Sequence, residues 1–201
     1  MNALPRSSWL LTVEEFLAFE EQSDVRHAYV GGEIHALVGA SVRHDEIVGN
    51  IYFRLREASR ARGCRLVTSD VKLQVAEDVI YYSDVILSCD PDDRAPYVLH
   101  KPLFVAEMPS PTTSVVDRRE KARLYLQVPT LLSYLIAYQD EMRVDFYWRS
   151  RPDDEWHFDV RFDGSVTIPG IDLRLPLNEI YDGIDFDATS GEPGGGGAAS
   201  I

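Results

Sequence analysis

Cysteine is scarce in this sequence, and the two that are present lie outside any known ligand pattern. Cys64 and Cys89 are the only cysteines among 201 residues, and neither belongs to a CxxC pair or a Cys/His ligand set. This spacing supports neither a zinc site nor a disulfide framework. We therefore predict two free thiols that pack as small apolar side chains.

Common catalytic motifs are missing as well. The five histidines show no HExxH or comparable spacing, and no serine lies within a GxSxG sequence. Histidine-based metal chemistry and a serine nucleophile on a strand-to-helix elbow are therefore not indicated.

Long hydrophobic runs are also absent. The longest, residues 131–138, is far too short to span a bilayer, and the first residues lack the apolar core of a signal peptide. We predict a cytoplasmic protein with one domain over residues 11–187, preceded by an extension at 1–10. Residues 188–201 are rich in glycine and poor in apolar side chains, which predicts a disordered tail.

Basic residues are outnumbered. Twenty Lys and Arg against 33 Asp and Glu give a net charge of −13, which by itself argues against a nucleic-acid partner. The charge is unevenly distributed, because residues 43–72 hold six arginines and one lysine against four acids. This segment could form a local positive face or simply a solvated helix surface, and charge alone leaves both interpretations open.

Apolar periodicity and turn residues predict an alternation of short elements. A capping box at Thr12 and Glu15 predicts a helix over 13–21, and apolar residues at helical spacing predict a longer helix over 44–62. Gly31-Gly32 indicates an antiparallel hairpin, and the acidic stretch 90–93 indicates a solvated turn. Strands are predicted over 65–68, 71–75, 79–87, 103–108, 131–138, 142–148, 155–161, 166–168 and 171–175, and helical segments over 117–125 and 176–181.

Two acidic residues lie inside runs that otherwise indicate apolar strands: Asp84 and Glu107. An unpaired buried carboxylate is costly, and two carboxylates held close together repel each other unless a cation lies between them. Mg²⁺ typically binds one or two carboxylates together with water and phosphate oxygens. If neighbouring strands bring the two side chains together, they form a candidate magnesium site.

A lysine follows on the next predicted helix. Asp117, Lys121 and Tyr125 are four residues apart and share one helix face. From that face Lys121 could orient an attacking water and offset charge on a phosphoryl group. The same spacing also fits a surface ion pair between Asp117 and Lys121 contributing about 0.3–0.5 kcal/mol, so spacing alone does not decide between the two.

Taken together, these motifs resemble the Uma2 family of endonucleases, within the PD-(D/E)XK nuclease superfamily. The resemblance covers about residues 11–181, and His44 matches the histidine that opens the family's long helix. The motifs that carry it are residues 68–72, 81–85 and 104–113, the Asp117-x-x-x-Lys121-x-x-x-Tyr125 helix, and residues 173–177.

The resemblance implies a mixed α/β fold: a restriction-endonuclease-like core with a central mixed β-sheet flanked by helices, plus an extra antiparallel hairpin. It implies that Asp84, Glu107 and the Met108 carbonyl hold Mg²⁺, with Mn²⁺ as a possible substitute. The superfamily's usual lysine position, two residues after the second acid, is occupied here by Pro109. Related families place this lysine on the following helix, and Lys121 occupies that position here, so the resemblance implies that Lys121 is the catalytic lysine.

The remaining candidate residues surround this set. His44, Asp117 and Tyr125 are predicted to support the site, and Arg43, Arg54 and Arg118 are predicted to contact DNA. A homodimer is a reasonable expectation for a small nuclease that must cut two strands.

The preferred hypothesis is a metal-dependent endonuclease that hydrolyses DNA. The alternative is a catalytically inactive nuclease-fold protein that binds nucleic acid or a protein partner. This alternative is suggested by the net charge of −13 and by the lack of an appended DNA-reading motif. The complete set of Asp84, Glu107 and Lys121 argues against it, because a protein that only binds does not need all three.

Overall fold

A computed structural model describes residues 10–37, 39–110 and 115–187, and for residues 115–117 only the backbone. The predicted tail at 188–201 and nearly all of the predicted extension at 1–10 lie outside these ranges. In the described part of the chain, no helix has the length and apolarity needed to cross a membrane.

Most elements lie where the sequence pattern predicts them, although β7 was not predicted. The helices are α1 (Val13–Glu20), α2 (Val42–Ala61), α3 (Val115–Tyr125) and α4 (Leu177–Ile180). The strands are β1 (His27–Val30), β2 (Glu33–Ala36), β3 (Arg65–Thr68), β4 (Lys72–Ala76), β5 (Val79–Tyr82), β6 (Val85–Ser88), β7 (Val98–Leu99), β8 (Phe104–Glu107), β9 (Ser133–Ala137), β10 (Val144–Trp148), β11 (His157–Arg161), β12 (Ser165–Ile168) and β13 (Leu173–Pro176).

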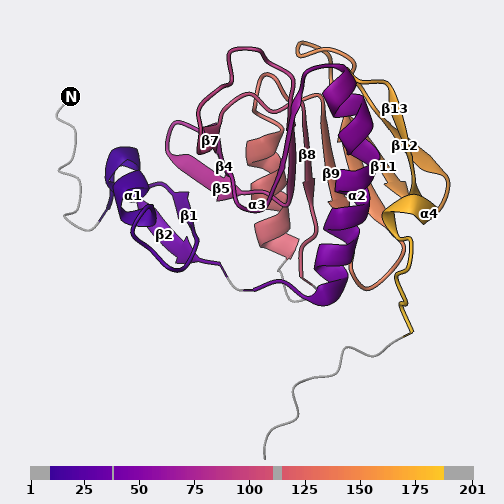
Figure 1. The fold of residues 1–201 in the computed structure, drawn as a ribbon, viewed down its shortest axis with the longest axis horizontal. Helices are drawn as coiled ribbons and strands as arrows, with labels where there is room; N and C mark the ends of the chain where they lie inside the picture. The colour runs from indigo at the N-terminus through magenta and orange to yellow at the C-terminus, as the bar shows by residue number, and fades with distance from the viewer. Residues whose placement is uncertain (1–9, 38, 111–114, 188–201) are drawn as a thin grey trace, which may run out of the picture.

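A six-stranded mixed sheet, in the order β11-β10-β9-β8-β6-β3, forms the centre of the molecule (Figure 1). Within it β8 and β9 are parallel, whereas the other neighbours are antiparallel. Parallel neighbours need a long crossover connection, and α3 lies in the one between β8 and β9. The predicted mixed α/β fold with a central mixed sheet is confirmed.

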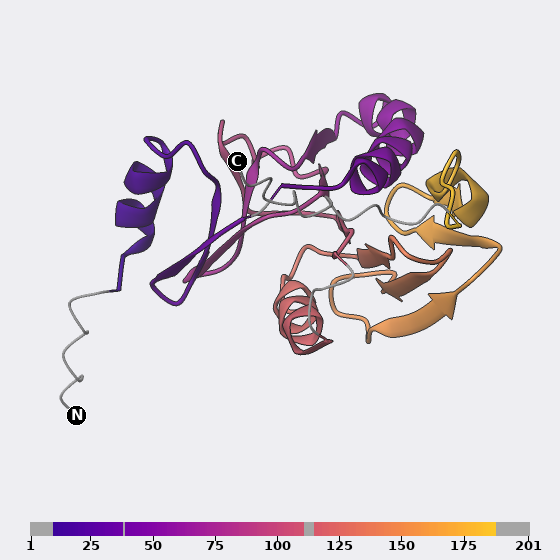
Figure 2. The same cartoon turned by 90° about the horizontal axis from the view of Figure 1, so that it is seen from below.

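The two faces of this sheet are covered by different layers, with α2 and α3 on opposite sides (Figure 2). On one face α2 buries Ile47, Ile51 and Leu55 against the sheet, together with α4 and the β12–β13 hairpin. On the other face Tyr125 of α3 packs with residues of a second sheet, including Leu73. The apolar stripe that the 3.6-residue period creates on α2 is therefore buried, whereas the more polar α3 buries Ala122 and Tyr125.

The second sheet has five strands, in the order β2-β1-β5-β4-β7. It includes the hairpin predicted at Gly31-Gly32, where both glycines adopt positive φ. Thr12 and Glu15 form the predicted capping box of α1. This N-terminal part extends to one side of the molecule in Figure 1.

The prediction of one continuous strand over residues 79–87 was wrong. The chain divides at Ser83 and Asp84 into β5, which pairs with β4 in the five-stranded sheet, and β6, which pairs with β3 in the six-stranded sheet. Both halves of the run are apolar because both are buried, so periodicity could not reveal the change of sheet at the polar pair between them. The two sheets therefore diverge at Asp84.

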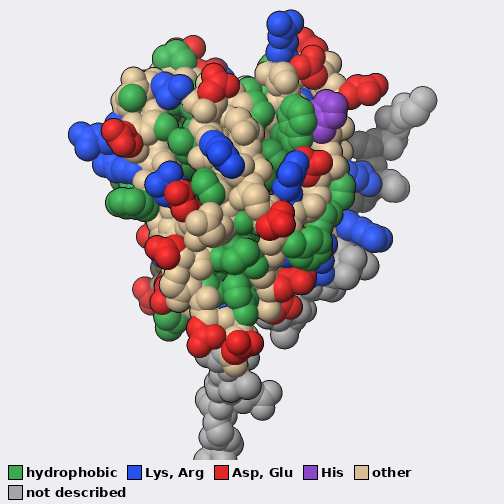
Figure 3. Space-filling model, turned by 90° about the vertical axis from the view of Figure 1, so that its right-hand side faces the viewer, with side chains coloured by type: hydrophobic (Ala, Val, Ile, Leu, Met, Phe, Trp, Pro, Cys, Tyr) green, Lys and Arg blue, Asp and Glu red, His purple; other side chains and the backbone are tan. Residues whose placement is uncertain are grey.

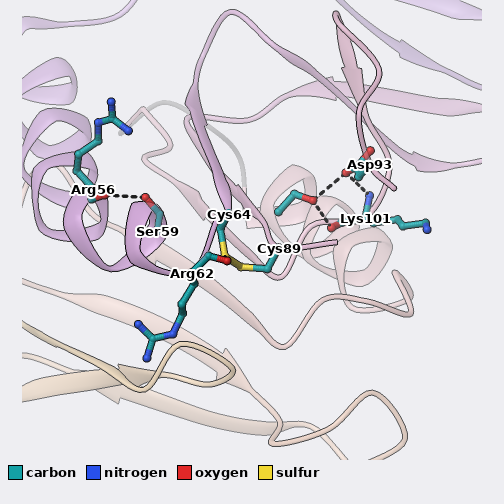
Figure 4. Close-up of a disulfide and its surroundings, with 8 residues drawn as sticks. Arg56, Ser59, Arg62, Cys64, Cys89, Asp93 and Lys101 are labelled. Atoms are coloured by element: carbon teal, nitrogen blue, oxygen red, sulfur yellow. Dashed lines mark hydrogen bonds between the residues drawn. A yellow bond between two sulfur atoms is a disulfide. The ribbon is translucent and has the colours of Figure 1, made fainter. Parts of the chain in front are cut away.

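The prediction of free thiols was also wrong, because Cys64 and Cys89 form a disulfide (Figure 4). Arg65 lies opposite Ser88 in the antiparallel β3–β6 pair, so the next residues outward, Cys64 and Cys89, also face each other. Strand register creates this proximity, and a separation of 25 residues gives no sign of it. Disulfides are rare in the reducing cytosol, so this pair is in tension with the predicted cytoplasmic location.

The acidic stretch 90–93 is a turn, as predicted, but it is not entirely solvated. Asp93 is buried and accepts hydrogen bonds from the Ser88 hydroxyl and from the backbone N–H groups of His100 and Lys101. This carboxylate therefore connects the two ends of the loop between β6 and β8 (Figure 4).

Candidate active site

Asp84 and Glu107 face each other across neighbouring strands. β6 and β8 are antiparallel with Val85 opposite Ala106, so continuing the register by one residue places Asp84 opposite Glu107. Opposed residues in such a pair project to the same face, with Cβ atoms about 4.5–5.5 Å apart. The two predicted carboxylates are thus brought together where the sheets diverge.

Two contacts hold the Asp84 carboxylate. Its Oδ2 accepts a hydrogen bond of 2.7 Å from the backbone N–H of Met108, and its Oδ1 lies 3.1 Å from His44 Nε2. His44 reaches it from the first turn of α2, where Asp45 Oδ1 lies 3.3 Å from the other ring nitrogen. The predicted supporting histidine therefore contacts one of the two carboxylates directly.

Glu107 is buried, and each of its carboxylate oxygens has a donor. Lys121 Nζ lies 2.7 Å from Oε2, and the Tyr125 hydroxyl donates to Oε1 at 2.5 Å. The Tyr125 hydroxyl also shares a 2.6 Å hydrogen bond with the Ser83 hydroxyl. Lys121 and Tyr125 are one helical turn apart on α3, and burial of Ala122 and Tyr125 turns this helix face toward the sheet.

Burial and neighbouring charges shift the pKa values of Glu107 and His44. Burial is the main reason why the pKa of Glu107 is raised; the Lys121 ammonium opposes the shift and the negative charge of Asp84 adds to it. Burial would lower the pKa of His44, but hydrogen bonds and charge from Asp84 and Asp45 raise it above its ordinary value. The repulsion between Asp84 and Glu107 is the kind that a bound cation relieves.

The site opens into a cleft of 850 Å³. The N-terminal part of the chain lines the cleft through residues 24–26, 37 and 39–41. The catalytic candidates and their neighbours line the same cleft: His44, Asp84, Glu107, Met108, Lys121 and Gln139. The cleft is therefore large enough for more than a single ion and water.

Gln139 is a site residue that sequence reasoning did not identify. It lies between β9 and β10, and its Nε2 donates to the carbonyls of Met108 at 2.8 Å and Pro109 at 3.0 Å. Its Oε1 accepts a 2.9 Å hydrogen bond from the Ser41 hydroxyl, at the N-cap of α2. A glutamine between the predicted strands 131–138 and 142–148 has no distinguishing pattern, so only the fold could reveal these contacts.

The oxygen donors of the site fit a hard divalent cation. Asp84 and Glu107 supply carboxylates, and the Met108 carbonyl has a second lone pair beyond the one that accepts from Gln139. No cluster of three or more His, Cys, Asp or Glu that could hold a metal occurs among the described residues. Two carboxylates and a carbonyl would leave coordination positions to water and substrate, as Mg²⁺ prefers.

The other predicted residues lie farther from this set or have protein partners. Arg43 donates to the backbone carbonyls of Gln139 and Asp185, and Arg54 Nε lies 2.5 Å from Glu179 Oε2. Arg118 lies 5.8 Å over the ring of Tyr138. The side chain of Asp117 lies outside the described part of the structure, and the DNA-contact roles of the three arginines stay predictions.

Comparison with known proteins agrees with the geometry. Residues 13–175 match the Uma2 family, described as "Putative restriction endonuclease". Two uncharacterized proteins of Synechocystis sp. are each 30% identical to this chain. One, slr1290, aligns over 178 residues, covering 88% of this chain and 94% of the relative. The other, sll1609, aligns over 142 residues, 69% of this chain and 80% of the relative.

A solved structure shares the fold. The crystal structure of a "putative nuclease belonging to DUF820" from Anabaena variabilis has a TM-score of 0.68 and 18% identity, covering 85% of this chain and 97% of that one. The helices and strands of this chain are therefore arranged much as in that structure. With the family match over most of the chain, it follows that this chain belongs to the Uma2 family.

Proposed function

We propose that this chain is a metal-dependent endonuclease that hydrolyses phosphodiester bonds of DNA. The observation that carries the proposal is the convergence of Asp84, Glu107 and Lys121, from three separate parts of the chain, in one cleft. The family description and the description of the Anabaena structure both support a nuclease. DNA as the substrate and dependence on Mg²⁺ or Mn²⁺ are parts of the proposal.

In this proposal Asp84, Glu107 and the Met108 carbonyl hold the metal ion. When bound, the ion neutralises charge on the scissile phosphate and lowers the pKa of a nearby water. Lys121 Nζ, already 2.7 Å from Glu107, orients the attacking water and offsets the negative charge that develops on the phosphoryl group. Hydrolysis leaves a 5′-phosphate and a 3′-hydroxyl.

The surrounding side chains keep the two carboxylates in place. Tyr125 holds one oxygen of Glu107 and is itself held by Ser83, while His44 contacts one oxygen of Asp84. Gln139 fixes the backbone at Met108. Such support matters because displacement of a ligand by about 1 Å can cost a hundredfold in rate.

Positive charge at the cleft supports a polyanionic substrate despite the acidic composition. The Tyr82 ring, which lines the cleft, has Arg26 at 5.9 Å and Lys72 at 5.5 Å from its centroid. Arg26 is half exposed and also forms an ion pair with Asp70. Arg26 lines the same cleft as the catalytic candidates, and Lys72 lies over the ring of another lining residue, Tyr82. Phosphates adjacent to the scissile one could be bound there.

The test is cleavage of supercoiled plasmid, linear duplex, single-stranded DNA and RNA by the purified chain, with Mg²⁺, Mn²⁺ or a chelator. We expect metal-dependent cutting of DNA. Asp84→Asn and Lys121→Met should each lower the rate by at least about 100-fold. Lys101→Met is the matched control, because Lys101 pairs with Asp90 on the surface and does not line the cleft.

Absence of cleavage of every nucleic acid tested would refute the proposal, as would full activity of Lys121→Met. Calorimetry separates the nuclease from a protein that only binds. A nuclease should bind Mn²⁺ in a manner that is lost in Asp84→Asn and kept in Lys101→Met, whereas a protein that only binds nucleic acid needs no such ion.

A further inference from the structure

The outer edge of the central sheet carries exposed apolar side chains. β11 is the last strand of the six-stranded sheet, and among the described residues no strand pairs with its outer side. Phe158 and Val160 are 50% and 42% exposed, and Phe162, just beyond the strand, is 58% exposed. These residues alternate along the chain and therefore project to one face.

This apolar edge continues a row of aromatic rings that begins in the core. Phe158 lies opposite Tyr147 of β10, with ring centroids 4.5 Å apart, and Tyr147 follows Tyr134 and Tyr125 in the same row. Figure 3, in which the right-hand side of Figure 1 faces the viewer, shows hydrophobic side chains exposed between charged ones. An open strand edge with apolar side chains is a template for pairing with another strand.

The sequence of this edge is complementary to itself. Residues 158–162 read Phe-Asp-Val-Arg-Phe. Asp159 and Arg161 project to the face opposite the apolar residues, and Arg161 Nη2 lies 3.1 Å from Asp159 Oδ2. If two copies pair antiparallel about Val160, Phe158 lies opposite Phe162, and Val160 lies opposite itself. Asp159 of each copy then lies opposite Arg161 of the other. One face of the paired strands joins apolar side chains, and the other face joins acids with bases.

We propose that two copies of this chain dimerise by antiparallel pairing of β11 with β11, centred on Val160. The two-fold axis then runs perpendicular to the sheet, and the six strands of each copy join in one continuous sheet. A symmetric contact of this kind uses the same patch on both subunits and closes on itself. The self-complementary pattern selects a second copy of the chain over an unrelated partner.

This dimer places both clefts on the same face of the joined sheet, because the axis maps that face onto itself. Three strand spacings separate β8 from β11, so the two sites would lie roughly 34 Å apart across the strands, at about 4.8 Å for each spacing. The proposal depends on the edge strand alone and stands whether or not the site is catalytic.

The test is sedimentation equilibrium of the full chain over a series of concentrations. We expect a monomer–dimer equilibrium for the wild type and monomers for Val160→Lys, which would place two lysines face to face. Phe53→Lys is the matched control, because Phe53 on α2 is an even more exposed apolar side chain at 76% and should leave the dimer intact. Circular dichroism should be unchanged, since both positions are exposed.

Charge reversal tests the register. Asp159→Arg or Arg161→Asp alone places like charges opposite each other and should weaken the dimer by at least about tenfold. The double exchange Asp159→Arg with Arg161→Asp restores opposite charges and should restore the dimer. A wild type that is monomeric at every concentration, a dimer that survives Val160→Lys, or a double exchange no stronger than the single changes would overturn the proposal.

Discussion

Removal of the disulfide between Cys64 and Cys89 should destabilise the protein without affecting its active site. The bridge joins the residue before β3 to the residue after β6, with a separation of 25 residues. In the chain-entropy account, closing a loop of this length lowers the entropy of the unfolded chain by about 12 cal/mol/K, equivalent to about 3.5 kcal/mol at room temperature. We therefore expect Cys64→Ser and Cys89→Ser each to lower the free energy of unfolding by about this amount.

The bridge is remote from the cleft. Asp84 precedes β6 and Cys89 follows it, and an extended strand of this length separates them by about 17 Å. The carboxylates are held by β8, α2 and α3, none of which includes a cysteine. The nuclease activity that we propose should therefore be unchanged in Cys64→Ser when it is assayed well below the unfolding temperature.

Urea denaturation followed by fluorescence, with and without a reductant, is the measurement. A loss of about 3.5 kcal/mol corresponds to a midpoint lower by roughly 1–2 M urea. The double variant should be no less stable than either single variant, because both remove the same bond. Wild-type midpoints that agree within error in oxidising and reducing buffer would refute the reasoning.

Three further changes test the contacts around the site and the loop. Tyr125→Phe removes a donor to the buried Glu107 carboxylate and should cost about 1.5–3 kcal/mol in urea denaturation; unaltered stability would contradict this hydrogen bond. Gln139→Leu removes the support of the Met108 carbonyl and should weaken Mn²⁺ binding by at least about tenfold in calorimetry; equal affinity would exclude that support. Asp93→Ala leaves buried donors without an acceptor and should cost about 2–3 kcal/mol in thermal or urea unfolding, whereas a cost below about 0.5 kcal/mol would show that the loop does not depend on it.

Local patterns predicted most elements because each depends on neighbours in the chain. The capping box begins α1 where Thr12 and Glu15 predicted it, and Gly31-Gly32 forms the predicted hairpin. The apolar spacing of Ile47 and Ile51 predicted the buried face of α2. These features need only helix or turn geometry within a few residues.

The divided strand shows where such patterns fail. β5 and β6 are apolar on both faces because each strand is buried. The change of sheet at Asp84 depends on which strands lie alongside, β4 for the first half and β3 for the second. Alternation along one strand carries no information about its neighbours.

The residues alone indicate the available chemistry: two acids in apolar strands, and a lysine and a tyrosine on one helix face. That Asp84 lies opposite Glu107 and that Lys121 reaches Glu107 depends on how distant segments pack in the folded chain. The same packing places Cys64 opposite Cys89. The physical reason is that register between strands is set by long-range packing, whereas periodicity within one element is set by its own backbone geometry.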